Sequence, residues 1–560
     1  MEGAQGMASG LTDVQGSNSR GRRPATASRR AGWRRLTLAP ATLLVLALIV
    51  VALVPRLWPL GGYATDYQDE GAYWQSLRSL AAGHHLFSEV FSSQPPFFLL
   101  GLFPFYVLFG QTLVAARLGV VLYSLLGLAG LSYIARATGG RAAALLALAL
   151  LIVDPLYLNA SYSLQAEGPA VALGAAGVAL AAVTSRVTGP PRHLLALGGG
   201  IVIGLGIMAK LFDVVAVLPA ALYLLLPADH SWLGRADANT PPPVRSRLET
   251  RRARLGRYAR RALPDLVLLG IGAVVSVTAL FLPYKLAGAP AYDQAVRFHL
   301  VVEQTWLNNG PQYNLQLIET TLRDAYSWPY ALLALVSCLL AVWRRAWTVV
   351  PPLAWLLASL LVLARQQPLL GHQLVLIAPP LAVLAALVLP LIAGPRLGQR
   401  LRDRVSPIKS FAAALPVVAV LVVAAAVLGI GTARSLSAAN ARAQPIPAID
   451  MAMARALDAT TGPGDIIVTD LQYVAGLADR NVPPWLVDTS QVRIVAGNQA
   501  GRFISTPEVL SIIAHDHVRV ILSAGHKFFF LPGFLPWVRQ HYRPAVRFGP
   551  DQVLYIKNGE

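Results

Sequence analysis

Charged residues are scarce in this chain, since Asp, Glu, Lys and Arg together make up only 13% of its 560 residues. Soluble domains carry about 25% charged residues, so this chain has too little charge to coat the surface of a soluble protein of its size. Hydrophobic residues reach 55%, and the mean hydropathy is +0.53. The composition therefore excludes a set of soluble domains and predicts a membrane protein.

Cysteine and lysine are also scarce. The single cysteine, Cys338, lies inside an apolar run, which excludes an internal disulfide and a cysteine-based metal site. No internal repeat and no Gly-rich phosphate loop of the nucleotide-binding type is visible. Only five of the 47 basic residues are lysines, and the excess over 28 acidic residues gives a net charge of +19. In a membrane protein such an excess acts first on orientation, so we expect no nucleic-acid partner.

The N-terminal segment is polar and basic. Residues 1–35 are rich in Gly, Ser and Ala and carry seven arginines, which predicts a disordered basic tail in the cytoplasm. The apolar run 36–54 follows directly. Because no small-residue cleavage site follows this run, the sequence favours a retained first membrane helix over a signal peptide.

Further apolar segments fill the chain up to about residue 433. They begin near Pro96, Leu113, Ala142, Gly168, Leu194, Leu211, Leu263, Trp328, Trp347, Gly371 and Phe411. Spanning a bilayer takes about 20 residues, and the run 96–109 is shorter, so we expect it to be re-entrant or to lie along the interface. The predicted fold class is a polytopic α-helical membrane protein with about 11–13 transmembrane helices.

Arginine-rich loops predict the orientation of these helices. Nine arginines crowd residues 228–262, and further basic groups stand at Arg344–Arg345 and in 396–409. Such loops stay in the cytoplasm. Loops 59–95, 288–327 and 365–370, with everything after about residue 434, then fall outside, together with Glu167 and Lys210. We therefore expect a multi-pass protein of the plasma membrane with a cytoplasmic N-terminus.

The last part of the chain changes character. Short β-branched runs at 465–470 and 518–522 are separated by stretches of helical pattern, which predicts a small extracytoplasmic α/β domain. The predicted organisation is thus a tail (1–35), a membrane domain (36–433) that includes the loop 59–95, and the C-terminal domain (434–560).

The loop 59–95 has the most unusual composition. Asp66, Asp69 and Glu70 lie within five residues, followed by Tyr73 and, further on, by Gln94-Pro95-Pro96. Clustered carboxylates repel one another unless a cation or a proton is near, an arrangement that suits a general base facing an acceptor hydroxyl. A merely solvated acidic loop is the alternative.

Ionisable residues also lie at the ends of apolar segments. Lys210 is flanked by apolar residues on both sides. An ionisable residue in such a place indicates function, here as a cation for a lipid phosphate. The alternatives are that Lys210 snorkels to the interface or pairs with Asp213. Glu167 directly precedes the apolar segment that begins near Gly168, and at the start of a helix the helix dipole alone favours an acid. Arg297 and His299 suit a phosphate or a simple interfacial position, and His372 lies at the end of a later helix.

In their order, these features resemble a known family, the GT-C glycosyltransferases of the protein O-mannosyltransferase and lipid A aminoarabinose transferase type (glycosyltransferase family 39 type). The resemblance covers residues 36–395 and lies in an acidic pair followed by a tyrosine, a Pro-Pro that opens a helix, a second outer acid, a Gly-rich helix ending in lysine, and a long basic inner loop. Ala72 stands where the aminoarabinose transferase pattern has an arginine, and Gln94 where it has a lysine. The domain after residue 434 resembles no named module.

The resemblance implies an inverting transfer of a sugar from a polyprenyl-phosphate donor to an acceptor outside the cell membrane. It implies that Asp69 acts as base or orients the acceptor, and that Lys210 contacts the lipid phosphate. We expect catalytic residues at Asp69, Glu70 and Glu167, and substrate-binding residues at Asp66, Tyr73, Gln94, Lys210, Arg297, His299 and His372.

Several alternatives stay open on the sequence. The acceptor is a glycan, a lipid or a protein, and the sugar is a hexose or a pentose. A divalent ion, Mg²⁺ or Mn²⁺, at the outer carboxylates Asp69 and Glu167 is one further alternative. A transporter or flippase for a glycoconjugate, in which Lys210 and Glu167 line a path, is the competing function class.

Overall fold

The structure is a computed structural model. It describes residues 40–63, 67–226, 244–307, 309–324, 327–392 and 407–559. The chain divides into two compact units, 1–47 and 48–560; of the first unit, the structure describes only the backbone that begins helix α1 (Pro40–Leu57). The predicted basic tail, Asp66, residues 228–243 and residues 396–406 lie outside the described residues.

Within the described residues, eight helices are long and apolar enough to cross a membrane. They are Leu113–Ile152, Glu167–Thr184, Pro191–Ala209, Ala262–Leu286, Ser327–Arg344, Trp347–Arg365, Gly371–Ile392 and Val418–Arg442. Three shorter apolar helices, Leu48–Leu57, Pro96–Leu108 and Leu211–Leu225, accompany them. The polytopic helical fold class is thus confirmed, whereas the long helices alone are fewer than the 11–13 that the sequence predicted.

The membrane helices differ from the predicted segments in two places. Helix α4 (Leu113–Ile152) contains Gly140 at φ +83°, a non-helical conformation. This kink lies beside Ala142, where the sequence predicted a new segment. Helix α9 (Val244–Leu286) begins well before the predicted start at Leu263, because most of the preceding residues are Arg, Leu, Ala or Glu, which are good helix formers.

The helix bundle around the site is built from close pairs. Helices α6 (Glu167–Thr184) and α7 (Pro191–Ala209) pack along each other, and α7 packs on α9. The remaining helices of this part are α5 (Pro155–Ala160), η1 (Leu211–Ala216), α8 (Val217–Leu225), α12 (Ser327–Arg344), η4 (Trp347–Val349), α13 (Val350–Arg365), η5 (Gly371–Ile377), α14 (Ala378–Ala386) and α16 (Pro407–Arg442). Glycines at the α6–α7 and α7–α9 contacts let the backbones approach.

Short helices lie in the two long loops of the membrane part. The first loop contains α2 (Tyr67–Ala81) and leads into α3 (Pro96–Leu108). The second contains η3 (Asp293–Arg297), α10 (Phe298–Val302) and α11 (Gly310–Arg323). At 13 residues, α3 is too short to cross a bilayer as a straight helix, and its interfacial or re-entrant position stays a prediction.

The C-terminal region contains a four-stranded sheet with the strand order β1-β2-β4-β3. Strands β1 (Ile467–Thr469) and β2 (Val520–Ser523) are parallel neighbours and confirm the two predicted strands. The antiparallel pair β3 (Tyr542–Arg547) and β4 (Val553–Lys557) was not predicted. The helices here are α17 (Ala448–Thr460), α18 (Gln472–Leu477), η6 (Pro484–Leu486), α19 (Gln491–Ala500), α20 (Thr506–His515), η7 (Lys527–Phe530) and α21 (Phe534–His541).

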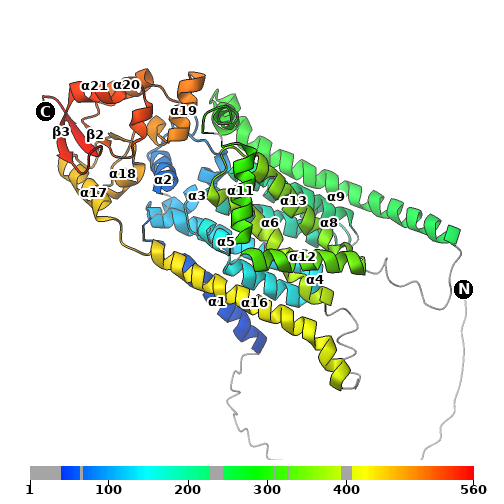
Figure 1. The fold of residues 1–560 in the computed structure, drawn as a ribbon. Helices are drawn as coiled ribbons and strands as arrows, with labels where there is room; N and C mark the ends of the chain where they lie inside the picture. The colour runs from blue at the N-terminus through cyan, green and yellow to red at the C-terminus, as the bar shows by residue number, and fades with distance from the viewer. Residues whose placement is uncertain are drawn as a thin grey trace, which may run out of the picture. The chain divides into compact units, whose positions relative to one another are not determined.

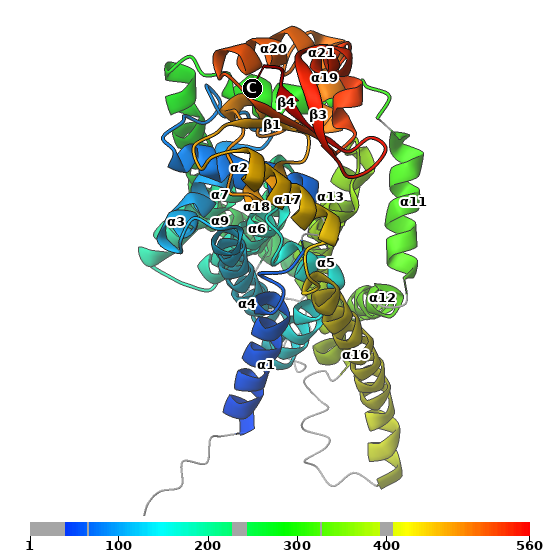
Figure 2. The same cartoon turned by 90° about the vertical axis from the view of Figure 1, so that its left-hand side faces the viewer.

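This C-terminal region lies against the first loop of the membrane part. Figures 1 and 2 both show α18 beside α2, at one end of the helix bundle. One hydrophobic cluster joins residues of α2 and α3, such as Leu77 and Leu99, to Val474 and Leu522 of the C-terminal region. The cluster therefore ties the helix that carries Asp69 and Glu70 to the region after α16.

Candidate active site

A buried ion pair joins the ends of α6 and α7. Glu167 is the first residue of α6, and Lys210 follows the last residue of α7 in an extended conformation. The Lys210 Nζ lies 2.9 Å from Glu167 Oε1, and the two side chains are 12% and 2% exposed. The pair forms because α6 and α7 lie close together, with Gly177 of α6 opposite Ile203 of α7. Lys210 thus pairs with Glu167 and not with Asp213.

A histidine from a distant part of the chain reaches the same carboxylate. His372 lies in η5, and its Nε2 is 3.5 Å from Glu167 Oε1. Its side chain is also mostly buried. Three residues that the sequence analysis selected separately, Glu167, Lys210 and His372, therefore converge on one point.

His299 lies near this group and is held by the first loop. Its Nε2 and the carbonyl oxygen of Ser93 are 2.8 Å apart, so the ring donates to that oxygen. Burial, and secondarily the positive charge of Lys210, lower the pKa of His299 to about 4. The imidazole is then neutral at pH 7 and brings no positive charge to a phosphate; its part in substrate binding stays a prediction.

Gln94 lies in the segment next to His299. The segment is fixed by Gln294, whose side chain accepts from the Ser92 N–H at 3.0 Å and donates to the Phe87 carbonyl at 2.7 Å. Gln94 is buried, and its amide contacts Ser93 Oγ at 3.3 Å. Within the described part of the chain, the Gln94 Oε1 has no hydrogen-bond partner, so this amide keeps an acceptor for a ligand hydroxyl.

Glu70 has a different environment from that of its neighbour Asp69. Its side chain is fully buried, and its two oxygens accept from Arg117 Nε at 3.1 Å and Arg117 Nη2 at 2.7 Å. The Leu164 N–H donates to the same carboxylate at 2.6 Å. A carboxylate with this many charge-assisted and backbone bonds is suited to holding chain segments together, so the contacts favour a positioning role for Glu70.

Arg117 also bonds to the backbone at the start of the first loop. Its Nη1 donates to the carbonyl oxygens of Leu60 at 2.8 Å and Gly62 at 3.0 Å. Arg117 is not among the site residues predicted from the sequence. The available signal was an arginine inside the apolar run that begins at Leu113, because ionisable residues in such runs are rarely without a role.

Asp69 and Tyr73 lie on one face of α2, one turn apart. Asp69 is half-buried in the first turn of the helix, in contrast to the enclosed Glu70. The Tyr73 ring packs edge-on against Phe98 of α3, with 4.7 Å between the ring centroids. Helix α2 therefore presents a carboxylate that retains access to solvent, beside an aromatic residue.

Arg297 lies outside the buried group. Its side chain is 48% exposed, and its nearest acid is Asp293, one turn earlier in η3, at 3.6 Å. The predicted Arg297–His299 phosphate pair is therefore divided between an exposed arginine and a neutral histidine. In the part of the chain that the structure describes, no group of three or more His, Cys, Asp or Glu residues is placed to hold a metal ion.

The chain is similar to several known proteins. Residues 93–236, which include Gln94, Glu167 and Lys210, match the family model of dolichyl-phosphate-mannose-protein mannosyltransferases. The crystal structure of apo ArnT from Cupriavidus metallidurans matches at TM-score 0.59 and 16% identity, over 92% of this chain and 98% of that one. A search of curated proteins gave no match.

Two further solved structures are similar. ArnT from Cupriavidus metallidurans bound to undecaprenyl phosphate matches at TM-score 0.58 and 15% identity, over 92% of this chain and 97% of that chain. The archaeal oligosaccharyltransferase AglB from Archaeoglobus fulgidus, in complex with an inhibitory peptide and a dolichol-phosphate, matches at TM-score 0.50 and 13% identity, over 93% of this chain and 74% of that chain. This chain has the GT-C fold. The resemblance inferred from the residues is confirmed at the level of the fold.

The GT-C fold extends past the membrane helices of this chain. The alignment with ArnT spans nearly the whole of both chains, so it includes the C-terminal region for which the sequence indicated no named module.

Proposed function

We propose that this protein is a membrane glycosyltransferase that moves a sugar from a polyprenyl phosphate to an acceptor hydroxyl. The observation that carries the proposal is the convergence of Lys210, Glu167 and His372 in a GT-C fold. The ArnT structure with undecaprenyl phosphate and the match of residues 93–236 to a dolichyl-phosphate-mannose-dependent family support a lipid-linked donor.

Lys210 is the residue we assign to the donor phosphate. When the bond between the sugar C1 and the phosphate oxygen breaks, its electron pair stays on the phosphate, and negative charge grows there. A fixed ammonium in a site with little water stabilises such charge more strongly than bulk solvent does. Glu167 holds the Lys210 side chain in position through their ion pair, and His372 places a ring nitrogen beside the same carboxylate.

Asp69 is the residue we assign to the acceptor. It takes the proton of the acceptor hydroxyl as the new bond to C1 forms, and attack from the face opposite the phosphate inverts the anomeric centre. Its partial exposure allows an acceptor to arrive from outside the bundle, while Gln94 offers its free acceptor to a hydroxyl. A divalent ion joining Asp69 and Glu167 stays a prediction.

The test is sugar transfer by the purified full-length protein in detergent, with a panel of undecaprenyl-phosphate-linked hexoses and pentoses and products read by mass spectrometry. A transporter or flippase produces no transfer product there, because detergent leaves no compartments. We expect Asp69→Asn to reduce turnover by about 10³-fold or more, as for loss of a catalytic base with its geometry kept.

The matched control for Asp69→Asn is Glu89→Gln. Glu89 is also an acid of the first loop, but it is exposed and bonded locally to His84 and His85. We expect this variant to keep nearly normal turnover. Normal turnover in Asp69→Asn, with the fold retained, would remove Asp69 from the proposal.

A further inference from the structure

Helix α2 packs closely against the C-terminal segment 472–481. A Cβ atom at Gly71 of α2 would lie 2.5 Å from the Tyr473 backbone nitrogen, and one at Gly476 would lie 2.4 Å from the Trp74 ring. Glycine on each side therefore allows the two segments to touch. This contact is adjacent to the first turn of α2, which carries Asp69 and Glu70.

Polar contacts continue along the same face of α2. Gln75 is fully buried, and its Nε2 donates to the carbonyl oxygens of Arg480 at 3.0 Å and Gln472 at 3.5 Å. One turn later, Arg78 donates to Asp479 at 2.7 Å and to Asn481 at 2.9 Å. Positions 71, 75 and 78 are spaced to share one helix face, so the contact is continuous over two turns.

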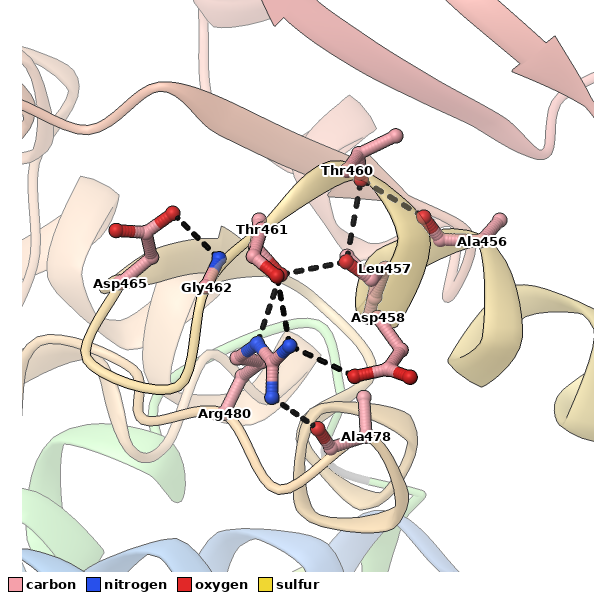
Figure 3. Close-up of polar contacts among 9 residues, drawn as sticks. All are labelled: Ala456, Leu457, Asp458, Thr460, Thr461, Gly462, Asp465, Ala478 and Arg480. Carbon is pink, nitrogen blue, oxygen red and sulfur yellow. Dashed lines mark hydrogen bonds and ion pairs between the residues drawn. The ribbon is translucent and has the colours of Figure 1, made fainter.

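The Arg480 carbonyl, which accepts the hydrogen bond from Gln75, belongs to a residue whose side chain is itself held by hydrogen bonds. Figure 3 shows the Arg480 guanidinium among the end of α17 and the loop after α18. It donates to Thr461 Oγ1 at 2.8 Å and to the Thr461 carbonyl at 2.7 Å. It also donates to the Ala478 carbonyl and to Asp458, each at 2.8 Å. Since Arg480 is buried and satisfied on every nitrogen, the loop 478–481 has little freedom to move.

The other side of the α2 first turn is held by a membrane helix. Glu70 bonds to Arg117 of α4 through both oxygens. Asp69 therefore lies in a helical turn of α2 that is bonded to α4 through Glu70 and packs on the C-terminal segment at Gly71. Lys210, which is assigned to the donor phosphate, follows α7, and its neighbours Glu167 and His372 lie on α6 and η5, so this group stands on separate elements.

We propose that the segment 472–481, here named the α2 brace, positions the acceptor base for the reaction. The positioning residues are Arg480 of the brace and Gln75 of α2, which bonds to it. The proposal rests on the assignment of Asp69 as base. Displacing a reacting group by about 1 Å costs up to about a hundredfold in rate. Loss of the brace should therefore act on turnover and leave donor binding intact.

The main test variant is Gln75→Met, which keeps the volume of the side chain but removes the donor to both carbonyls. We expect a fall in kcat of between about tenfold and a hundredfold, with an unchanged KM for the undecaprenyl-phosphate-linked sugar and unchanged binding of undecaprenyl phosphate itself. Amide hydrogen exchange in residues 67–81 should rise, since this helix loses its anchor. Arg480→Lys, which cannot make all four bonds, should give a smaller effect of the same kind.

The control variant is Arg539→Ala, an exposed arginine of the same C-terminal region, which should behave like the unmodified protein. A second arm combines Gln75→Met with Asp69→Glu, in which the carboxylate is already displaced. If Gln75 acts through Asp69, the two losses in kcat do not multiply. Fully multiplicative losses, unchanged exchange in α2, or a raised donor KM at unchanged kcat would each overturn the proposal.

The two proposals fail in different ways. If Asp69→Asn abolishes transfer and Gln75→Met leaves kcat and α2 exchange unchanged, the brace proposal is wrong and the glycosyltransferase proposal stands. If Asp69→Asn keeps normal turnover, the assignment of the base is wrong. A thermal unfolding measurement on each variant separates misplacement from loss of folded protein, because rates are then compared per folded molecule.

Discussion

Single residues at the site are arranged so that charge is balanced before any substrate binds. The buried Glu167 faces the Lys210 ammonium at 2.9 Å and the His372 ring at 3.5 Å. An uncompensated ammonium inside a protein is costly, and the Glu167 carboxylate offsets that cost for Lys210. The arrival of a phosphate adds the negative charge against which Lys210 then acts.

The first residue-scale prediction concerns Lys210. We expect Lys210→Ala to raise the KM for the lipid-linked donor and to lower kcat, because the ammonium contacts the phosphate both before and during bond breaking. The measurement is transfer kinetics over a range of donor concentrations. Lys285→Ala, at the exposed end of α9, is the control. A variant with normal donor KM and kcat would show that the phosphate lies elsewhere.

The second residue-scale prediction concerns His299 and pH. Its pKa is lowered to about 4 in the folded protein, against about 6.5 in an unfolded chain. Between these values the unfolded state binds the proton and the folded state does not, so stability falls as the pH drops from about 6.5 to 4, by roughly 3 kcal/mol in total. Unfolding of His299→Gln should lack this contribution. An equal pH dependence in the variant and the unmodified protein would contradict it.

At this scale the sequence predicted Lys210, Glu167 and His372 as site residues, but it did not predict that their side chains meet. Lys210 and Glu167 were predictable because ionisable residues in apolar surroundings are rare. The same signal is present for Arg117, an arginine inside an apolar run. That Glu70 bonds Arg117 while Asp69 stays half-exposed depends on which face of α2 meets α4, and that is set by tertiary packing.

Among the elements, α7 shows how glycine governs helix contact. A Cβ at Gly200 would lie 2.0 Å from the carbonyl oxygen of Leu269 in α9, whereas a Cβ at Gly198 would meet nothing within 4 Å. The two positions are two residues apart on the same helix but differ completely in what surrounds them. They offer a matched pair of substitutions.

The element-scale prediction compares Gly200→Ala with Gly198→Ala. We expect the first to destabilise the protein by about 1–3 kcal/mol, because the backbone of α9 has to move. The second should be neutral or stabilise by up to about 1 kcal/mol, because alanine is the better helix former. Thermal unfolding in detergent measures both. Equal effects of the two substitutions would mean that α7 and α9 are not in this contact.

The strands illustrate the limit of sequence patterns at the same scale. Strands β1 and β2 are short apolar runs with all residues buried, and their composition predicted them. Strand β3 contains Pro544 and two arginines, and its pairing with β4 shifts register between Pro544 and Val546. Such an edge strand lacks the regular alternation of apolar and polar residues that marks a strand. Its strand conformation therefore becomes evident only from its pairing with β4.

For the whole molecule, the distribution of arginine predicts which side of the membrane each end of the bundle faces. Glu167 and the Lys210 end of α7 lie at one end of α6 and α7, and the turn between these two helices, 185–190, lies at the other. The brace contact places α2 and the C-terminal region on a common side. The orientation of these ends relative to the cell remains a prediction from loop charge.

The whole-molecule prediction tests that orientation by cysteine labelling of intact cells. The background is Cys338→Ala, which removes the only cysteine, and single cysteines replace Ala82 after α2, Asp551 before β4, or Thr188 between α6 and α7, all exposed. We expect a membrane-impermeant maleimide to label positions 82 and 551 in intact cells, and position 188 only after permeabilisation. Labelling of position 188 with protection of position 82 would reverse the topology. The acceptor base would then face the cytoplasm, and an acceptor outside the cell could not reach it.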